Sequence, residues 1–258
     1  MDDEDGKYLA ETLRVLAGAD TWAARTNAGA LRLRPAPGSS LFADDERAHP
    51  YELSHAAWHL LSNAVDHLGC LQALLGDAKI IHMFAPFTLV RGALENACGA
   101  VWLLHPDRQQ DRLVRRLRLA LADVRNGEQV KQLTGGPGPR SAQERINQIH
   151  DIARSAGLGT AALKGNAAYS EIVKAVDEGA PGSLILLSWK VCSGFAHGDW
   201  WTTLSASRRT PIPGATREGV GTFKIEGNLS LLMQVTTLAV QMTRRGWWLH
   251  DQRCRVPS

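Results

Sequence analysis

Stretches in which apolar residues recur every three or four positions constrain the fold of this chain more than any other feature. Side chains at that spacing lie on one side of an α-helix, so each stretch predicts an amphipathic helix. The clearest example follows Pro50, where Leu53, Ala57, Leu60 and Ala64 begin a stripe that continues to Leu71. Helices are predicted in this way over 4–24, 50–75, 86–104, 107–133, 141–156, 169–176, 183–198 and 229–253.

The segments between these helices are rich in Gly, Pro and Ser. Residues 25–49 are interpreted as a linker, and the alternating residues around Pro211 and Pro213 predict a small β-hairpin or irregular insertion near 200–226. We therefore expect an all-α protein, a single-domain helical bundle of about five or six main helices. The domain covers 1–258, with an N-terminal helix and Gly/Pro-rich linker in 1–48 and a helical core in 50–254.

Charge and cysteine usage narrow the class of protein. The net charge is only +3, which is low for a protein that binds nucleic acid by charge alone. The four cysteines have no paired spacing, and the acidic start Met-Asp-Asp-Glu-Asp-Gly has no apolar signal region. No uncharged apolar run is long enough to span a membrane. We therefore expect a cytoplasmic protein without disulfides and without a membrane partner.

The segment from Ser183 to Gly198 is almost wholly apolar, yet it carries three chemically capable side chains. Lys190, Ser193 and His197 follow one another at spacings of three and four, so they are predicted to share one helix face. Gly198 is expected to end the helix in a left-handed cap. His197 would then lie in the last turn beside Asp199, both of which favour its charged form. We interpret His197 as a candidate general acid or base, oriented by Asp199 or Glu95.

The helix predicted over 86–104 carries Arg91 and Glu95 as its only ionisable residues. Arg before Glu is the weaker order for a surface ion pair, so helix stabilisation is a poor reason for the pair. Two interpretations stay open. Arg91 and Glu95 either form part of a site, together with Lys190, Ser193 and His197, or they serve as an internal strut between helices.

Eight tryptophans are many for this length. Trp102, Trp189, Trp200 and Trp201 lie close in sequence to the polar residues described above, and with Asp199 they are candidates for binding a substrate. Indoles are common core residues, but with a few convergent polar groups they also wall small-molecule pockets.

Two further polar faces are interpreted as solvated. On the helix after Pro50 one face carries His55, His59, Ser62 and Asp66, opposite the apolar stripe. On the helix over 107–133 another face carries Arg108, Arg112 and Arg115. Neither pattern predicts a metal site, and no motif predicts a cofactor.

Two short motifs, Arg91-Gly-Ala-Leu-Glu95 and Cys192-Ser-Gly-Phe-Ala-His-Gly198, resemble those of a group of uncharacterised bacterial helical proteins. That group is loosely similar to the HEPN superfamily of helical bundles, several of which are metal-independent ribonucleases or defence proteins linked to nucleic acid. The ribonuclease members use an Arg followed a few residues on by a His, usually at a dimer interface. The resemblance implies Lys190 and His197 for these roles, with lysine in place of arginine, and a homodimer.

Three functions follow from these patterns. The first is a small-molecule-binding protein with a Trp-lined pocket; if it is an enzyme, it would use acid–base chemistry in that pocket. The second is a HEPN-like ribonuclease or RNA-binding protein that uses Lys190 and His197. The third is a helical interaction protein in which these residues are structural. The first is preferred because its polar residues lie on helices that are predicted to be buried, whereas cleavage of a polymer needs an open basic groove.

Overall fold

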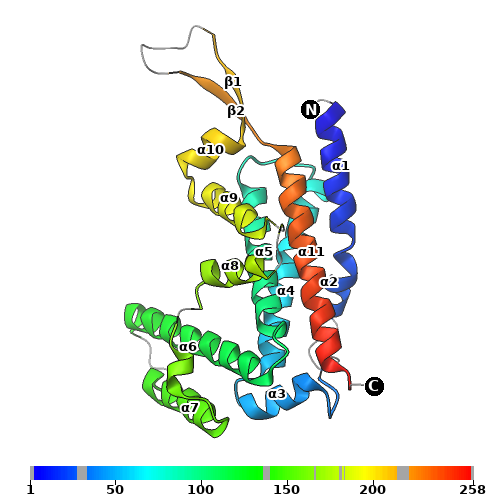
Figure 1. Ribbon diagram of the computed structural model, residues 1–258. Coiled ribbons are helices and arrows are strands. Elements are labelled where there is room, and N and C mark those ends of the chain that lie inside the picture. Colours follow the sequence, from blue (N-terminus) through cyan, green and yellow to red (C-terminus); the bar gives the residue numbers. More distant parts are fainter. Residues whose placement is uncertain are drawn as a thin grey trace. The chain divides into compact units, whose positions relative to one another are not determined.

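A computed structural model of the chain describes residues 3–27, 34–135, 140–165, 167–179, 182, 184–213 and 221–256. The all-α expectation with one small hairpin is confirmed (Figure 1), and these residues form more helices than the five or six expected. Ser183, where a helix was expected to begin, and residues 214–220 of the expected hairpin region lie outside the described residues. The helices are α1 (Asp3–Ala17), α2 (Asp20–Asn27), α3 (Ser40–Ala48), α4 (Leu53–Gln72), α5 (Ala85–Leu104), α6 (Gln109–Thr134), α7 (Ala142–Ser155), α8 (Tyr169–Glu178), α9 (Ile185–His197), α10 (Trp200–Ala206) and α11 (Leu229–Cys254), with the π-helix η2 (Ala73–Asp77), the 3-10 helix η3 (Thr160–Leu163) and the strands β1 (Arg208–Pro211) and β2 (Phe223–Glu226).

The chain groups into two compact units, each made of three separate stretches. Unit 1 comprises Met1–Ala28, Ser62–Ala97 and Ala180–Arg244, and unit 2 comprises Gly29–Leu61, Cys98–Gly179 and Arg245–Ser258. Helices α4, α5 and α11 each contribute one part to each unit. The expectation of a single domain over 1–258 stays a prediction. Among the helices of the described residues, none is both long and apolar enough to cross a membrane.

Local capping explains several helix ends. The Ser141 hydroxyl accepts from the Glu144 amide at 3.1 Å and the Ser141 amide donates to the Glu144 carboxylate at 2.8 Å, a capping box that begins α7. Asn228 Oδ1 accepts from the Leu231 amide at 3.0 Å and caps the start of α11. Gly198 ends α9 with φ of 72°, the left-handed cap that was predicted.

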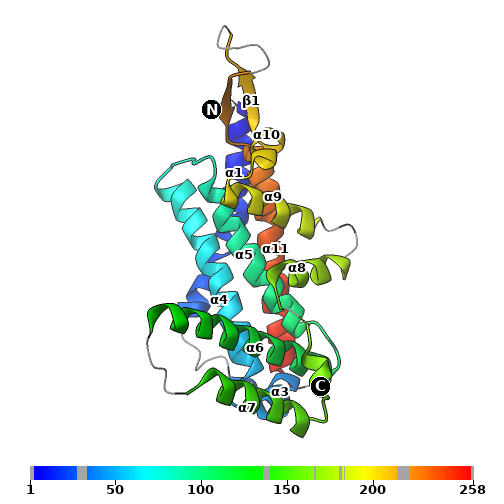
Figure 2. The same ribbon diagram turned by 90° about the vertical axis from the view of Figure 1, so that its left-hand side faces the viewer.

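Unit 2 has its own hydrophobic core, which joins α6, α7 and η3. Figure 2 shows α6 and α7 side by side, and the apolar stripe of α6 packs against Ile149 and Ala153 of α7. Spacings of three and four along α6 put this stripe on one face, as the sequence predicts. Its members are Leu113, Leu117, Ala120, Leu121 and Val124.

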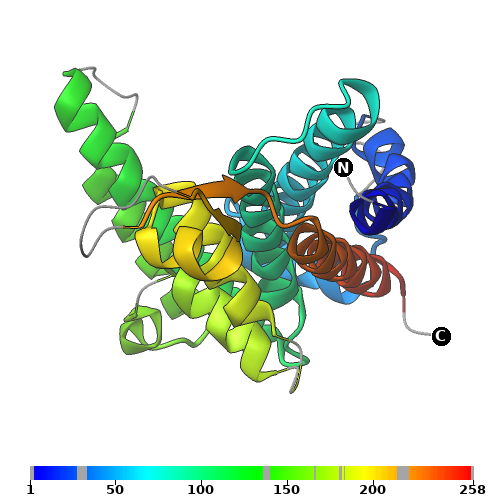
Figure 3. The same cartoon turned by 90° about the horizontal axis from the view of Figure 1, so that it is seen from above.

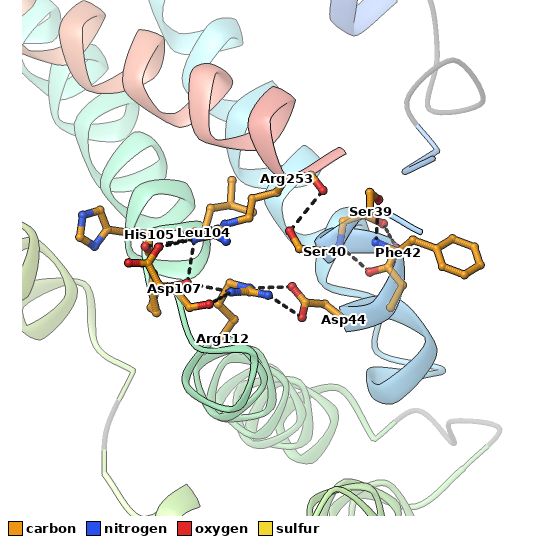
Figure 4. Close-up of polar contacts among 12 residues, drawn as sticks. Ser39, Ser40, Phe42, Asp44, Leu104, His105, Asp107, Arg112 and Arg253 are labelled. Atoms are coloured by element: carbon orange, nitrogen blue, oxygen red, sulfur yellow. Dashed lines mark hydrogen bonds and ion pairs between the residues drawn. The ribbon is translucent and has the colours of Figure 1, made fainter. Parts of the chain in front are cut away.

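The interpretation of Arg112 as a solvated residue is wrong. Its side chain is 2 % exposed and that of Asp44 is 0 % exposed. The two form a bidentate ion pair, in which Arg112 Nε and Nη2 lie 2.7 and 2.9 Å from the two carboxylate oxygens (Figure 4). Nη1 also donates to the carbonyls of Pro106 and Asp107. The guanidinium is therefore desolvated but fully paired, as a buried charge requires.

Asp44 lies on α3, a helix inside the stretch that was interpreted as a linker. The Ser39 hydroxyl caps its start by accepting from the Phe42 amide at 3.2 Å. Leu41, Asp44 and Ala48 are buried, so the face that repeats at three and four residues is turned inward. The sequence interpretation missed α3 because it is short and the residues before it are rich in Pro, Gly and Ser.

In unit 1, residues 201–207 were expected to form one strand of the hairpin predicted near 200–226, but residues Trp200–Ala206 form helix α10 (Figure 3). Gly194 explains how α9 and α10 pack: a Cβ there would lie 1.8 Å from Thr202 Oγ1. Only glycine allows this approach. The hairpin itself is present, with β1 antiparallel to β2 and Arg208 opposite Glu226. Arg208 also pairs with Asp5 of α1 at 2.8 Å.

Candidate functional site

The structure brings together, at Glu95, the two apolar helices on which the sequence analysis placed its candidate polar residues. Arg91 Nε donates to Glu95 Oε1 at 2.9 Å, and the indole Nε1 of Trp189, on α9, donates to the same oxygen at 2.8 Å. The Arg91 and Glu95 side chains are 26 % and 13 % exposed. One carboxylate oxygen therefore joins α5 to α9, which is the geometry expected of the internal strut.

Two α9 residues near this contact, Cys192 and Ser193, are not activated as nucleophiles. Burial raises the pKa of the Cys192 thiol to about 12, although the nearby charge of Arg91 acts to lower it, so the thiol stays protonated at neutral pH. Ser193 Oγ is buried without a hydrogen-bond partner among the described residues. No base is thus in place to activate Ser193 as a nucleophile.

Lys190, His197 and Asp199 are exposed, whereas the sequence predicted a buried site. Within the described part of the chain, the side chains of Lys190 and His197 make no hydrogen bond or ion pair. Leu184 and Leu187 of the same segment are also exposed. The segment was therefore wrongly expected to be buried on nearly all sides. Ile185, Cys192, Gly194 and Phe195 are the buried residues of α9.

The predicted tryptophans have different surroundings. Trp200 and Trp201 on α10 are 75 % and 49 % exposed, so they do not wall an enclosed pocket. Trp102 belongs to unit 2, where its carbonyl accepts a hydrogen bond from Arg115 and its ring lies 5.0 Å from that guanidinium. It lines a pocket of about 50 Å³ that also contains Arg245.

A larger pocket of about 350 Å³ lies in unit 2, at a place that the sequence analysis did not indicate. Helix α3, the start of α4 and the end of α11 form its walls, with the segment before α3. Its volume is at the small end of the range for ligand sites. The lining residues are Arg34, Pro35, Phe42, Asp45, Glu46, Glu52, Ser54, His55, Trp58 and His250.

The ion pair of Asp44 with Arg112 decides which side chains of α3 face this pocket. Figure 4 shows Asp44 directed at Arg112 while Phe42 projects away from it. A helix turns about 100° per residue, so Asp45 and Glu46 are rotated away from Asp44. Ser40 holds the start of α3 to the end of α11 by donating to the Arg253 carbonyl at 3.4 Å. Buried contacts on one face of α3 thus present polar and aromatic residues on the other.

Asp45 is the most constrained carboxylate of the pocket. It accepts from the Ser54 amide at 2.9 Å and from the Ser54 hydroxyl at 2.5 Å, and so holds the first turn of α4. Partial burial raises the pKa of Asp45 despite these hydrogen bonds, which act to lower it. The Leu53 backbone amide donates to Asp45 as well. A carboxylate has about four acceptor positions, so these three donors leave about one position unused.

Glu52 is held differently in the same pocket. Its Oε1 lies 2.7 Å from His49 Nδ1, and Oε2 lies 3.6 Å from His55 Nδ1. Burial acts to raise its pKa, but hydrogen bonds with its own backbone and with His49, together with the histidine charges, leave the pKa lowered. The Arg116 guanidinium, on α6, donates to the Glu52 carbonyl at 3.1 Å and fixes the backbone there.

Aromatic side chains supply the apolar part of the pocket. Trp58 lies edge-to-face against Trp247, with ring centroids 5.5 Å apart, and Trp247 makes a similar contact with His250 at 5.8 Å. These contacts hold Trp58 in one orientation. A rigid indole next to partly buried carboxylates is the usual composition of a small-molecule site.

Other arrangements are less suited to a ligand. A hollow of about 610 Å³ in unit 1 is lined mainly by small side chains of α2 and α4, including Ser62 and Gly69. Among the described residues, no three His, Cys, Asp or Glu side chains are grouped as a metal site requires. His55 is exposed as predicted, yet it lines the pocket of unit 2. The acidic run Asp44-Asp45-Glu46 before His49 was the sequence signal that could have indicated this pocket.

Known proteins supply no independent indication of a ligand or a reaction. Function is therefore inferred from side-chain geometry. The chain matches no protein-family model, no protein of curated function and no solved structure.

Proposed function

We propose that this chain is a small-molecule-binding protein and that the pocket of unit 2 formed by α3, α4 and α11 is its binding site. The observation that carries the proposal is the convergence of Asp45, Glu52 and Trp58 on one pocket of about 350 Å³. These side chains are held by Ser54, His49 and Trp247, so the pocket is formed before a ligand arrives. Preformed sites lose less entropy on binding.

A matched pair of histidines on α4 allows a direct test. His55 lines the pocket, and His59, one turn further along, lies outside it; both are exposed. In His55→Trp a larger side chain should fill the pocket, whereas His59→Trp adds the same group elsewhere. A library of small metabolites and fragments would be screened by ligand-observed NMR against the wild type and both variants.

We expect ligands that bind the wild type and His59→Trp but not His55→Trp. The proposal fails if no compound binds the wild type, or if hits bind all three proteins alike. Circular dichroism spectra of the variants would verify that each protein is folded.

A second candidate function concerns α9 and α10 of unit 1: binding or metal-independent cleavage of RNA, as the HEPN resemblance implies. Lys190 and His197 are exposed and seven positions apart, which puts them on one side of α9. Trp200 and Trp201 add exposed rings on which bases can stack. This exposure suits a polymer better than the enclosed pocket that the sequence predicted there. The expected homodimer belongs to this candidate function.

Variants at the exposed histidines of unit 1 test the second candidate. His197→Ala should abolish decay of a single-stranded RNA in the absence of metal, whereas His82→Ala should leave it unchanged. If the wild type neither binds nor cleaves RNA, or if both variants act like it, this candidate fails.

A further inference from the structure

The chemistry of the unit 2 pocket also indicates the class of its ligand. Three carboxylates, Asp45, Glu46 and Glu52, line it against one guanidinium, that of Arg34. Protonated His49 and His55 would offset part of the negative charge at Glu52. The charges of His55 and Arg116 also act on Asp45. Glu46 has no such partner among the described contacts, and the three carboxylates outnumber the one guanidinium of the pocket lining, so the electrostatic potential at Glu46 favours a positive group.

Hydrogen-bond capacity leads to the same conclusion. Asp45 is half-buried and donates nothing when ionised, and the Ser54 hydroxyl and the backbone amides of Ser54 and Leu53 donate to it, which leaves about one of its four acceptor positions open. Glu46 is exposed at the rim and has no side-chain partner within the described residues. A ligand that brings N–H donors or a fixed positive charge would pair with these oxygens. A ligand anion would be repelled by them.

The aromatic side chains make an organic cation more suitable than a metal ion. Trp58 and Phe42 line the pocket beside the carboxylates, and tryptophan is the best cation–π partner. Metal ions instead require several oxygen, nitrogen or sulfur ligands at fixed short distances. No described group of His, Cys, Asp and Glu residues has that arrangement.

We propose that the pocket binds an organic cation, an amine or quaternary ammonium group attached to an apolar body. The ammonium group would lie between Asp45 and Glu46, and the apolar body would lie against Trp58 and Phe42. This inference rests on the proposed function of the same pocket.

The test uses four probes of similar shape and different charge: benzylamine, benzyltrimethylammonium, benzyl alcohol and benzoate. Binding to the full chain would be measured by NMR titration at neutral pH. The two cations should bind at least about tenfold more tightly than benzyl alcohol, because they gain a charge-assisted contact. Benzoate should bind most weakly of the four.

Variants assign the contributions of single side chains. Trp58→Leu keeps an apolar wall but removes the ring, and should weaken benzyltrimethylammonium binding roughly two- to twentyfold. Asp45→Asn should weaken benzylamine binding about tenfold or more. Because Asp45 also holds α4, Glu46→Gln at the exposed rim serves as the second variant and should weaken binding by a smaller factor. Asp151→Asn, an exposed carboxylate on α7, is the matched control and should change nothing.

The outcomes separate this inference from the proposed function. If benzyl alcohol or benzoate binds as tightly as the amines, or if the library yields only neutral or anionic ligands for the pocket, the organic-cation inference is overturned and the binding function stands. If no probe and no library compound binds, both fall.

Discussion

Two arginine–carboxylate pairs, one in each unit, differ in how they are built and in how visible they are in the sequence. Arg91 and Glu95 are four positions apart on one helix, share a single hydrogen bond and retain partial exposure. Arg112 and Asp44 are 68 positions apart, share two hydrogen bonds and are almost completely buried. The first pair attracts attention because the rest of its helix is apolar. The second is hidden among the many arginines of α6.

The comparison shows that charged residues on an otherwise apolar helix are easily noticed in the sequence. Being noticeable in this way does not mean that they are the most buried. Partners within one helix follow from spacing alone. Partners on different helices depend on how those helices pack. Sequence reasoning therefore singled out the weaker pair and interpreted the stronger arginine as solvated.

The largest expected effect tests whether the buried pair is the stronger one. Asp44→Ala should lower the free energy of unfolding by about 3–5 kcal/mol, because the Arg112 guanidinium would be left buried without its charge partner. Urea unfolding measures this. Asp151→Ala, which breaks the exposed pair with Arg154, is the control and should cost less than about 1 kcal/mol. Equal losses in the two variants would show that the burial of Asp44 is energetically unimportant.

A smaller loss is expected at the Glu95 junction. Glu95→Ala should cost about 1–3 kcal/mol, since Trp189 loses its acceptor while Arg91 can still be hydrated. Glu95→Gln keeps an amide oxygen for Trp189 and should recover most of this loss. Urea unfolding with tryptophan fluorescence as the probe would follow both variants. A loss for Glu95→Ala that exceeds that of Asp44→Ala would reverse the comparison.

Asp45 sharpens the comparison, because it is next to Asp44 in sequence but accepts from Ser54 instead of arginine. Its pKa is raised in the folded state, so the folded protein keeps this proton to higher pH than the unfolded chain does. The free energy of unfolding should therefore fall as pH rises from the unfolded to the folded pKa of Asp45. The pKa of Glu52 is lowered, so its contribution is lost as pH falls through its folded pKa.

The measurement is urea unfolding of the wild type and Asp45→Asn across the acidic range. The free energy of unfolding of the wild type, relative to that of Asp45→Asn, should fall as pH rises between the unfolded and folded pKa of Asp45. The other charged and titratable groups around the pocket are the same in both proteins; they are Glu46, Glu52, His55, Arg34, Arg116 and His250. A difference that stays constant with pH would contradict the raised pKa.

The smallest effect is expected at His197, which the sequence suggested as a candidate general acid or base. His197→Ala should change the free energy of unfolding by less than about 0.5 kcal/mol, because the side chain is exposed and has no partner among the described residues. Thermal unfolding would detect a larger change. Such a change would mean that His197 makes a stabilising contact after all.

The fold could be predicted where periodicity is strong and long. The spacing of apolar residues identified α4, α5, α6 and α11 closely, and Gly198 marked the end of α9. Short elements were predicted less well. Helix α3 was interpreted as linker, and α10 was assigned to the hairpin region because residues 201–207 alternate in part between apolar and polar side chains.

The candidate site shows the same limit. Glu95 of α5 accepts a hydrogen bond from Trp189 of α9, so these two apolar helices meet at this point. The predicted burial of His197, Lys190 and Trp200 was wrong, because burial depends on which neighbours cover a helix. The pocket of unit 2 collects residues from the segment before α3 and from α3, α4 and α11, and these residues lie up to 216 positions apart. No local pattern contains that information.

The two neighbouring aspartates of α3 couple binding in the pocket to the stability of this helix. Asp44 anchors the helix while Asp45 faces the pocket, so the two sides of one helical turn cannot move independently. A compound that occupies the pocket at about 100 times its dissociation constant would add about 2.7 kcal/mol to the stability of the occupied fold. Amide protons of α3 would then exchange more slowly with solvent, and the helix itself would report whether the pocket is filled.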